Sequence, residues 1–445
     1  MGQIPTKKKM AKITVGPKHK RRSVTEAVRC APANSYIFIE PGFYTETDVI
    51  VIDKSVVLVG LSGEGNAVTV QMSSVSCVMV ATSEHVVIQG IEFATTAAKP
   101  VIDIQQGDVV LEACTIDHGE EGVLLSHHGC SLVMTNCVVS NANKAGIVCG
   151  GAETVLLVDR SNIRDCQTGV HIYQDANPVI SKTTIVQCGT GVVVTDNGRG
   201  CIVDSTLSLN KKPGILTNSG GNPVVVNTKI VDGNSNGLFA RTNGRGVVVD
   251  CEIAKNLFPG IASCEEGRPY VVGTKVREGK NAGIFVYDNG SGLFVGCQLR
   301  ENTMPGVEVR QTGNPILVDC DVSRGQSNGI YLHNKAGGVF VRTAVKENAL
   351  PGMAIVNNAD PLVYDCSLVA GKDYALYVND HGRGLVVKSR IEGCSAQPLC
   401  LQDSHCVLQD CEVIDGKKIN IEEWLEKIPP DLPLLEEDLP DFGAV

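Results

Sequence analysis

Large aromatic side chains are scarce in this chain of 445 residues. Aromatic residues make up 4% of the sequence and the single tryptophan is Trp424, although hydrophobic residues as a whole make up 43%. A core built around large rings is therefore excluded. The interior must rest on Val, Ile, Leu and small residues, which suit close packing in β structure.

The chain also lacks long hydrophobic runs. No stretch approaches the roughly 18 consecutive apolar residues of a transmembrane helix, and the basic N-terminus has no apolar core of the kind that a secretion signal carries. Eighteen cysteines are present, but no two of them form a CxxC pair. We therefore expect a cytoplasmic protein with reduced, buried cysteines, no metal site and no cofactor.

Positive charge is concentrated at the N-terminus. The formal net charge is -10, yet residues 1–22 contain eight Lys or Arg and no acid, while residues 417–445 are rich in Asp and Glu. The remaining body is strongly acidic, which argues against a surface that follows a nucleic-acid backbone. Nucleic acid is therefore not expected as a partner.

One repeat accounts for most of the chain. A Gly followed by an apolar-x-apolar triplet recurs every 22 to 24 residues, and from Gly191 onward every step is 23 residues. These anchoring glycines are Gly122, Gly146, Gly169, Gly191, Gly214, Gly237, Gly260, Gly283, Gly306, Gly329 and Gly352. Short alternating strands separated by Asn, Gly or Pro follow each anchor, which predicts the turns of a β solenoid.

Two further columns support the solenoid. Fourteen residues after each anchor, from Thr183 to Ser389, stands a Cys, Ser or Thr, which indicates an inward ladder in a tight interior. Elsewhere in the repeat Asn and Gly alternate, as in Gly279 and Asn302, so that the full unit is a pair of turns. We therefore predict an all-β parallel β-helix of about 23 residues per turn.

The segments 283–292 and 306–315 resemble the β-helix of F-box-only ubiquitin-ligase adaptors and other repeats of the carbohydrate-binding and sugar-hydrolase type. The opening segments 23–29, 37–46 and 56–60 are similar to the cap helix and first coils of pectin-lyase-like proteins. The resemblance implies a single-stranded, right-handed parallel β-helix with a short N-terminal cap helix over residues 23–416. The charge pattern adds a basic tail 1–22 and an acidic, Pro-rich tail 417–445. No F-box precedes the repeat and no zinc finger follows it, so recruitment to a ligase is not implied.

The catalytic motifs of polygalacturonase-like enzymes are missing from the chain, and no run of the repeat offers the carboxylate density of a calcium-dependent lyase. One group of acid, base and phenol side chains falls on neighbouring turns. It comprises His127, His128, His171, Tyr173, Asp175 and Asp196. Proton removal next to a carboxylate needs such a base and an opposed acid, as in mannuronan epimerases and alginate lyases. Solvated turn residues remain the plainer interpretation, and we lean against enzymatic activity.

An aromatic stripe is the most informative surface feature. Outward positions on every second turn place aromatic rings on one line, and the next outward positions add further polar and aromatic side chains. The predicted binding face consists of Phe239, Arg241, Phe285, Tyr287, Tyr331, His333 and Tyr377. In a chain so poor in aromatics, such a line indicates an interaction site. Sugar stacking and a protein partner both fit it.

The N-terminus matches the myristoylation pattern at Gly2, and a polybasic run follows directly. An acyl chain with basic residues would form a two-signal membrane anchor. Our main functional hypothesis is a non-catalytic intracellular scaffold or adaptor that binds a protein along its lateral face, with a cytoskeletal or ciliary assembly as one setting. The alternative is a polysaccharide epimerase or lyase that acts on acidic glycans.

Overall fold

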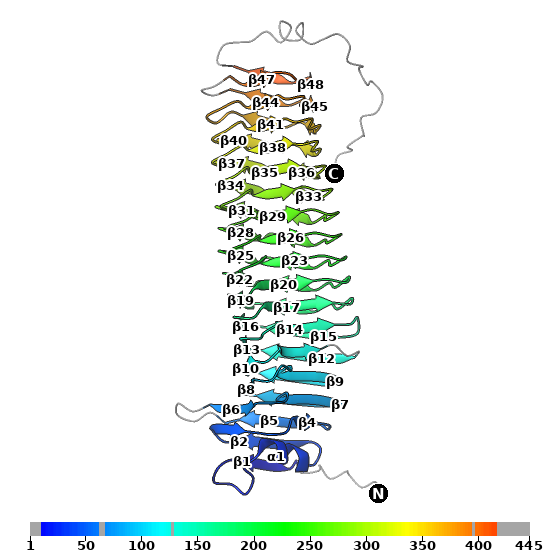
Figure 1. Ribbon diagram of the computed structural model, residues 1–445, viewed down its shortest axis with the longest axis vertical. Coiled ribbons are helices and arrows are strands. Elements are labelled where there is room, and N and C mark those ends of the chain that lie inside the picture. The colour runs from blue at the N-terminus through cyan, green and yellow to red at the C-terminus, as the bar shows by residue number, and fades with distance from the viewer. Residues whose placement is uncertain (1–9, 62–66, 126–128, 394–396, 416–445) are drawn as a thin grey trace, which may run out of the picture.

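A computed structural model describes residues 10–61, 67–125, 129–393 and 397–415. The chain winds into a straight rod of about 17 right-handed turns of about 23 residues, with almost no helix (Figure 1). Each complete turn contributes three short strands, and every strand pairs in parallel with its counterparts one turn before and after. The predicted right-handed parallel β-helix is confirmed.

A short helix covers the N-terminal end of the rod. Helix α1 (Val24–Cys30) buries Val24, Ala27 and Val28, and the Ser23 hydroxyl caps it by accepting the Glu26 amide at 3.1 Å. The expected cap helix is therefore present. Strand β1 (Lys12–Val15) precedes it and pairs with Tyr36–Ile39, so the first turn begins inside the segment expected to be a basic tail. The alternating sequence of Lys12–Val15 stands outside the repeat, which explains why the period alone did not reveal it.

Face 1 is the stack of strands that follow the anchoring residues. Its strands are β4 (Ile50–Ile52), the first part of β7 (Val78–Gln89) and of β9 (Ile102–Glu112), β11 (Glu121–Leu125), β14 (Ala145–Gly150), β17 (Thr168–Tyr173), β20 (Thr190–Val194), β23 (Ile215–Thr217), β26 (Leu238–Ala240), β29 (Ile261–Ser263), β32 (Ile284–Val286), β35 (Val307–Arg310), β38 (Ile330–His333), β41 (Met353–Ile355), β44 (Leu376–Val378) and β47 (Leu399–Leu401). The stacking is in register, because Ile284 lies beside Ile261 on one side and Val307 on the other.

Face 2 follows face 1 within each turn. Its strands are β1, β2 (Ser35–Ile39), β5 (Val56–Gly60), the second part of β7 and of β9, β12 (Cys130–Thr135), β15 (Val155–Asp159), β18 (Val179–Ser181), β21 (Cys201–Val203), β24 (Val224–Val226), β27 (Val247–Val249), β30 (Tyr270–Val272), β33 (Ser291–Val295), β36 (Asn314–Val318), β39 (Val339–Val341), β42 (Leu362–Tyr364), β45 (Arg383–Val387) and β48 (His405–Gln409).

Face 3 completes each turn. Its strands are β3 (Gly42–Thr45), β6 (Val68–Met72), β8 (Ile91–Thr95), β10 (Thr115–His118), β13 (Val138–Ser140), β16 (Asn162–Arg164), β19 (Thr184–Val186), β22 (Thr206–Ser208), β25 (Lys229–Val231), β28 (Glu252–Ala254), β31 (Lys275–Arg277), β34 (Gln298–Arg300), β37 (Asp321–Ser323), β40 (Ala344–Lys346), β43 (Ser367–Val369), β46 (Arg390–Glu392) and β49 (Glu412–Ile414).

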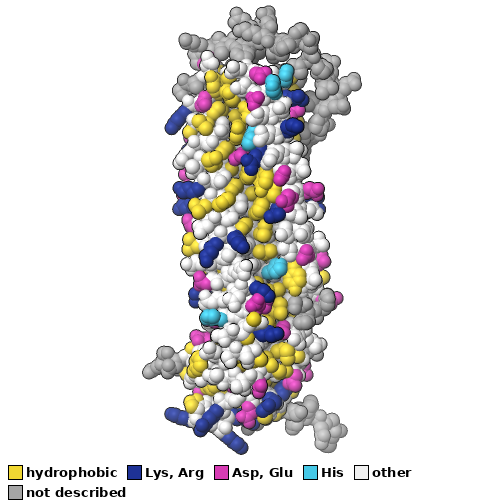
Figure 2. Space-filling model, viewed as in Figure 1, with side chains coloured by type: hydrophobic (Ala, Val, Ile, Leu, Met, Phe, Trp, Pro, Cys, Tyr) yellow, Lys and Arg dark blue, Asp and Glu magenta, His cyan; other side chains and the backbone are white. Residues whose placement is uncertain are grey.

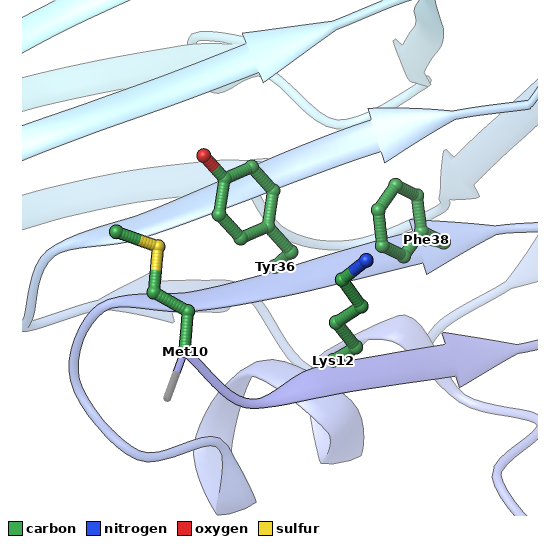
Figure 3. A pocket seen from close by; sticks show the side chains of 4 residues that line it. All are labelled: Met10, Lys12, Tyr36 and Phe38. Carbon is green, nitrogen blue, oxygen red and sulfur yellow. The ribbon is translucent and has the colours of Figure 1, made fainter. Parts of the chain in front are cut away.

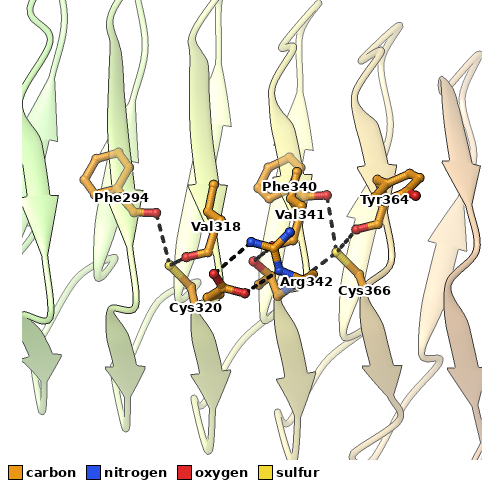
Figure 4. A network of polar contacts seen from close by, with 10 residues as sticks. Phe294, Val318, Cys320, Phe340, Val341, Arg342, Tyr364 and Cys366 are labelled. Carbon is orange, nitrogen blue, oxygen red and sulfur yellow. Dashed lines mark hydrogen bonds and ion pairs between the residues drawn. The ribbon is translucent and has the colours of Figure 1, made fainter. Parts of the chain in front are cut away.

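The small-residue column lies at the corner between faces 2 and 3 and satisfies backbone carbonyls there. The Cys320 thiol lies 3.4 Å from the carbonyl oxygens of Phe294 and Val318, and Cys366 repeats the arrangement two turns later (Figure 4). Only a Cys, Ser or Thr is small enough for this corner and also able to donate a hydrogen bond. The inward ladder inferred from the sequence is therefore a hydrogen-bonding device as well as a packing one.

The pairing of turns has a direct structural cause. Asn302 is buried, accepts the Gly279 amide at 3.0 Å through Oδ1 and donates to the Val276 carbonyl at 3.2 Å through Nδ2. A Cβ placed at Gly279 would lie 3.0 Å from that Oδ1 atom. Asn256 and Asn348 accept the amides of Gly233 and Gly325 in the same way, so a close approach favours Gly opposite these Asn side chains, although Asn210 accepts the amide of Cys188.

Candidate functional site

The three faces differ in the chemistry of their outward side chains. Face 3 carries charges that pair with one another, as Arg300 does with Asp321 at 2.9 Å. Face 2 carries mainly Val, Leu and Ile. Face 1 combines aromatic rings with His, Arg and Glu, and Figure 2 shows a hydrophobic band along the rod where Figure 1 places its strands. Face 1 is therefore the first candidate for a ligand surface.

The aromatic stripe lies on face 1, facing outward. Phe239, Phe285, Tyr331 and Tyr377 are half-buried, while their neighbours Leu238, Ile284, Ile330 and Leu376 are fully buried. Strand alternation produces this division, because successive side chains point to opposite sides of a sheet. The rings are thus held by rigid strands and remain partly open to solvent.

On several turns of face 1, side chains two residues apart form flat pairs. The rings of Phe285 and Tyr287 stack with centroids 4.5 Å apart, and those of Tyr331 and His333 stack at the same distance. The Arg241 guanidinium lies 5.9 Å from the Phe239 ring centre. Flat, partly exposed ring pairs of this kind offer platforms for the apolar faces of sugar rings.

A charged cluster lies on β35, between these two ring pairs. The Arg310 guanidinium lies 4.9 Å from the Phe285 ring centre and 5.7 Å from that of Tyr287. Its Nε atom is buried without a hydrogen-bond partner, and no ion pair among the described residues includes Arg310. The neighbouring Glu308 carboxylate instead lies 3.4 Å from His333 Nε2. Arg310 is therefore a positioned cation that lacks an anion.

The phenols of the cluster are held in their protonated form. Burial raises the pKa of Tyr331, and the nearby Glu308 carboxylate raises it further. Burial also raises the pKa of Tyr287, with a contribution from its hydrogen bond to Cys264. Both side chains therefore stay protonated at neutral pH, and Tyr331 can donate a hydrogen bond to a bound ligand.

The acid–base group expected from the sequence forms a second patch at β17. His171 and Tyr173 stack with ring centres 5.1 Å apart, and His171 Nε2 lies 3.4 Å from the Thr195 hydroxyl. Asp175 and Asp196 lie in neighbouring turns, where the Asp175 amide donates to the Asp196 carbonyl at 3.3 Å. Burial lowers the pKa of His171, and the Asp196 charge partly opposes that effect. The other two expected members, His127 and His128, lie outside the described residues.

Two hollows elsewhere on the rod are less suited to chemistry. One, of about 630 Å³, is lined by Met10, Lys12, Tyr36 and Phe38 (Figure 3). The Tyr36 and Phe38 rings stack with their centres 6.1 Å apart, and Lys12 is the one charged residue among the four. The other, of about 380 Å³, lies on face 3, where Lys229 and Arg277 both pair with Glu252. The residues that line the first hollow include no histidine or carboxylate, and those that line the second include no aromatic ring, so neither hollow combines aromatic platforms with an acid–base pair.

The sequence reasoning identified the aromatic members of the face 1 cluster but missed Glu308 and Arg310. The signal was present, because Leu216, Ala262 and Ala354 occupy the Glu308 position on the other intervening turns. In the described part of the chain, no group of three His, Cys, Asp or Glu side chains could hold a metal ion, and α1 with seven residues cannot span a membrane. Gly2 lies outside the described residues.

Comparison with known proteins identifies the fold. The sequence matches the family described as a right handed beta helix region over residues 56–204, 168–318 and 305–422. Among curated protein sequences none matches. The resemblance to F-box-only adaptors finds no support in these comparisons.

Solved structures with the same fold include several polysaccharide enzymes. The A-module of mannuronan C-5 epimerase AlgE6 from Azotobacter vinelandii is 11% identical with a TM-score of 0.33, over 88% of this chain and 94% of the epimerase module. The catalytic domain of a GH87 alpha-1,3-glucanase is 12% identical with a TM-score of 0.44, over 76% of this chain and 65% of that domain. The PL6 family alginate lyase AlyGC is 9% identical with a TM-score of 0.39, over 91% of this chain and 80% of the lyase.

These comparisons contradict the hypothesis of a non-catalytic scaffold in a cytoskeletal or ciliary assembly. The solved structures named above are described as polysaccharide-active enzymes and not as scaffolds or adaptors, so the scaffold hypothesis is not retained. The scaffold hypothesis depended on the resemblance to adaptors and on absent motifs, and a missing motif does not exclude a different arrangement of acid and base. At 9% to 12% identity the likeness itself establishes only the fold. The function must therefore be argued from the side chains.

Proposed function

The chain belongs to the right handed beta helix family, and from that premise we propose that it binds an acidic polysaccharide along face 1 and acts on it as a lyase or epimerase. The observation that carries this proposal is the unpaired guanidinium of Arg310, held over the rings of Phe285 and Tyr287. A uronate supplies both the carboxylate that this cation lacks and a sugar face for the rings.

The spacing of the turns suits an extended polymer. Successive aromatic positions of the stripe are two turns apart, or about 10 Å, which is about the length of a disaccharide in an extended chain. Tyr331 and Tyr377 would contact sugars on one side of Arg310, and Phe239 would contact them on the other. The polymer would therefore lie parallel to the rod axis, with one carboxylate at Arg310.

The cluster also holds the groups that proton abstraction requires. In the tautomer that donates Nε2–H to Glu308, His333 keeps Nδ1 as a basic nitrogen, and the stacked Tyr331 remains a protonated phenol. Binding of the carboxylate by Arg310 would acidify the adjacent C–H, His333 would take that proton, and Tyr331 would donate one. In a lyase, the bond to the leaving oxygen breaks as the C=C bond forms. In an epimerase, no group leaves, and water would return a proton to the opposite face of the same carbon, because Tyr331 and His333 stack on one side of the sugar.

Calorimetric titration with oligouronates and with neutral oligoglucans of equal length tests the binding step. The wild-type protein should bind the oligouronates more tightly, and Arg310→Gln should weaken that binding about ten- to a hundredfold, because a hydrogen bond to a charged group contributes about 1.5 to 3 kcal/mol. Arg342→Gln, at a corner distant from face 1, is the matched control and should bind normally. Equal binding of neutral and acidic chains, unaffected by Arg310→Gln, would refute the proposal.

The chemical step has a separate readout. Incubation with polyuronates should generate unsaturated sugar ends, detected by their ultraviolet absorbance, or exchange the C5 proton for solvent deuterium, detected by NMR. His333→Ala should abolish either signal and preserve most of the binding. If the wild-type protein binds oligouronates but shows neither signal, the binding assignment stands and the catalytic one is wrong.

A further inference from the structure

The C-terminal end of the described rod exposes side chains that belong to its core. Three inward columns reach the last described turn, where their members are Leu401, Leu408 and Val413, paired with Val378, Val386 and Ile391 of the turn before. The three side chains of the turn before are fully buried, whereas the three of the last turn are half-buried although they pack against the core. Cys411, at the corner, is also half-buried. We call these four residues of the last turn the open end.

The strands of the same turn are paired on one side. β47, β48 and β49 each pair with the strand of the turn before, and no strand among the described residues lies on their other side. An unpaired edge beside an apolar interior is a template for association with another chain. At the opposite end of the rod, helix α1 covers the first turns and buries Val24, Ala27 and Val28 (Figure 1). The open end lacks such a cover within the described part of the chain.

The chain that continues beyond Asp415 carries the sequence pattern of an amphipathic helix. Its apolar residues recur at i, i+3, i+4 and i+7 and are Ile421, Trp424, Leu425 and Ile428. This spacing places four side chains on one face of a helix. Asn420 is a preferred N-cap residue with Glu423 three positions later, and Pro429 follows the last apolar residue, as at a helix end. Residues 416–445 lie outside the described residues, so this pattern comes from the sequence.

The length of the connection suits the open end. Asp415 is the last described residue and follows β49, and six steps of extended chain from there to Ile421 span at most about 20 Å. A nine-residue helix is about 13 Å long, and a five-residue strand on one face of the rod is about 17 Å long. A short tether also gives the segment an effective concentration in the millimolar range at this end. The segment is therefore the nearest apolar cover of matching size.

We propose that residues 420–428 form an amphipathic helix that covers the open end, as α1 covers the other end of the rod. Trp424 and Leu425 would lie on the exposed core side chains, and burial of both apolar surfaces supplies the free energy. The acidic residues of the segment fall on the opposite face of the helix, which stays in water. The cover would keep the edges of the last turn from pairing with another chain. This proposal is independent of any activity on face 1.

Fluorescence of the full chain tests the proposal from the side of the segment, because Trp424 is the single tryptophan. Native emission should lie at shorter wavelength than in urea, and it should not change on dilution. Val413→Asp places a charge in the open end and should shift the emission to longer wavelength. Val231→Asp is the matched control, since it changes a half-buried, outward Val on the same face, and it should leave the emission unchanged. Native emission equal to that in urea would overturn the proposal. Burial of Trp424 that Val413→Asp does not affect, or that is lost on dilution, would do so too.

Thiol labelling tests the proposal from the side of the rod. Alkylation of Cys411 by iodoacetamide, followed by mass spectrometry, is measured relative to Cys30, which is exposed near the other end. The variant Leu425→Asp/Ile428→Asp should raise the relative rate about tenfold or more, because each apolar side chain removed from the contact weakens docking by about that factor. Leu434→Asp/Leu435→Asp, beyond the helical pattern, is the control and should not change the rate. Circular dichroism verifies that the variants fold. A Cys411 rate that the Leu425→Asp/Ile428→Asp variant leaves unchanged would overturn the proposal.

Discussion

Replacing Asn302 by Ala should destabilise the rod far more than the loss of a few side-chain atoms suggests. Asn302 is 1% exposed, and its amide group satisfies both the Gly279 N–H and the Val276 carbonyl. Both backbone groups are on buried residues, so the Ala variant leaves them without partners. An unsatisfied buried group costs about 1 to 3 kcal/mol, so we expect a loss of about 2 to 6 kcal/mol in the free energy of unfolding.

Urea denaturation followed by circular dichroism, together with native-state hydrogen exchange, measures this effect. Hydrogen exchange is needed because a solenoid can open locally without unfolding as a whole, and the Gly279 amide should lose protection first. Gln326→Ala, at an exposed position one turn later, is the control and should change stability by less than about 0.5 kcal/mol. If Asn302→Ala costs no more than this control, the proposed role of the Asn ladder is wrong.

A double variant tests the steric half of the same argument. Gly279→Ala should be destabilising because its Cβ would approach Asn302 Oδ1 to 3.0 Å, which is closer than ordinary contact. In the Asn302→Ala background that obstruction is absent, so the added cost of Gly279→Ala should be smaller. Additive costs would show that Asn302 does not determine the need for Gly at this position.

Three further predictions follow from other parts of the rod. Ile284→Ala should lower the free energy of unfolding by about 2 to 5 kcal/mol in urea denaturation, and Phe285→Ala should lower it much less, because Ile284 is fully buried and Phe285 is not. Equal losses would show that the aromatic stripe is covered. The pKa of His171 should lie below its usual value and fall further in Asp196→Asn, which NMR titration would detect. Because the folded pKa is depressed, neutral His171 contributes to the free energy of unfolding above about pH 6.5. That contribution is lost as the pH falls through the unfolded and then the folded pKa of His171. Burial raises the pKa of Cys366 to about 12, so mass spectrometry should find it unmodified by iodoacetamide until the protein is denatured, and rapid alkylation of the native protein would contradict the inward column.

The architecture could be predicted from the sequence because, in a solenoid, residues that are one repeat apart in the sequence are adjacent in the structure. Residues 23 positions apart lie side by side, so the inward positions of Ile284 and Ile330 and the outward positions of Phe285 and Tyr331 followed directly from alternation. The Cys, Ser and Thr column was identified in the same way. The strand at Lys12–Val15 was missed, because it stands before the helix and outside the period.

The sequence by itself determined the fold, the inward and outward faces and the position of the aromatic stripe, since these depend on local alternation and a regular repeat. The tertiary structure alone decided that Arg310 lies over Phe285 and Tyr287 while Glu308 turns to His333, because side-chain rotamers choose among several neighbours at nearly equal distance. It also showed that Arg245 and Asp250 lack partners whereas Arg342 and Asp319 have each other. Pairing of charges across turns depends on reach and geometry, which a linear pattern does not contain.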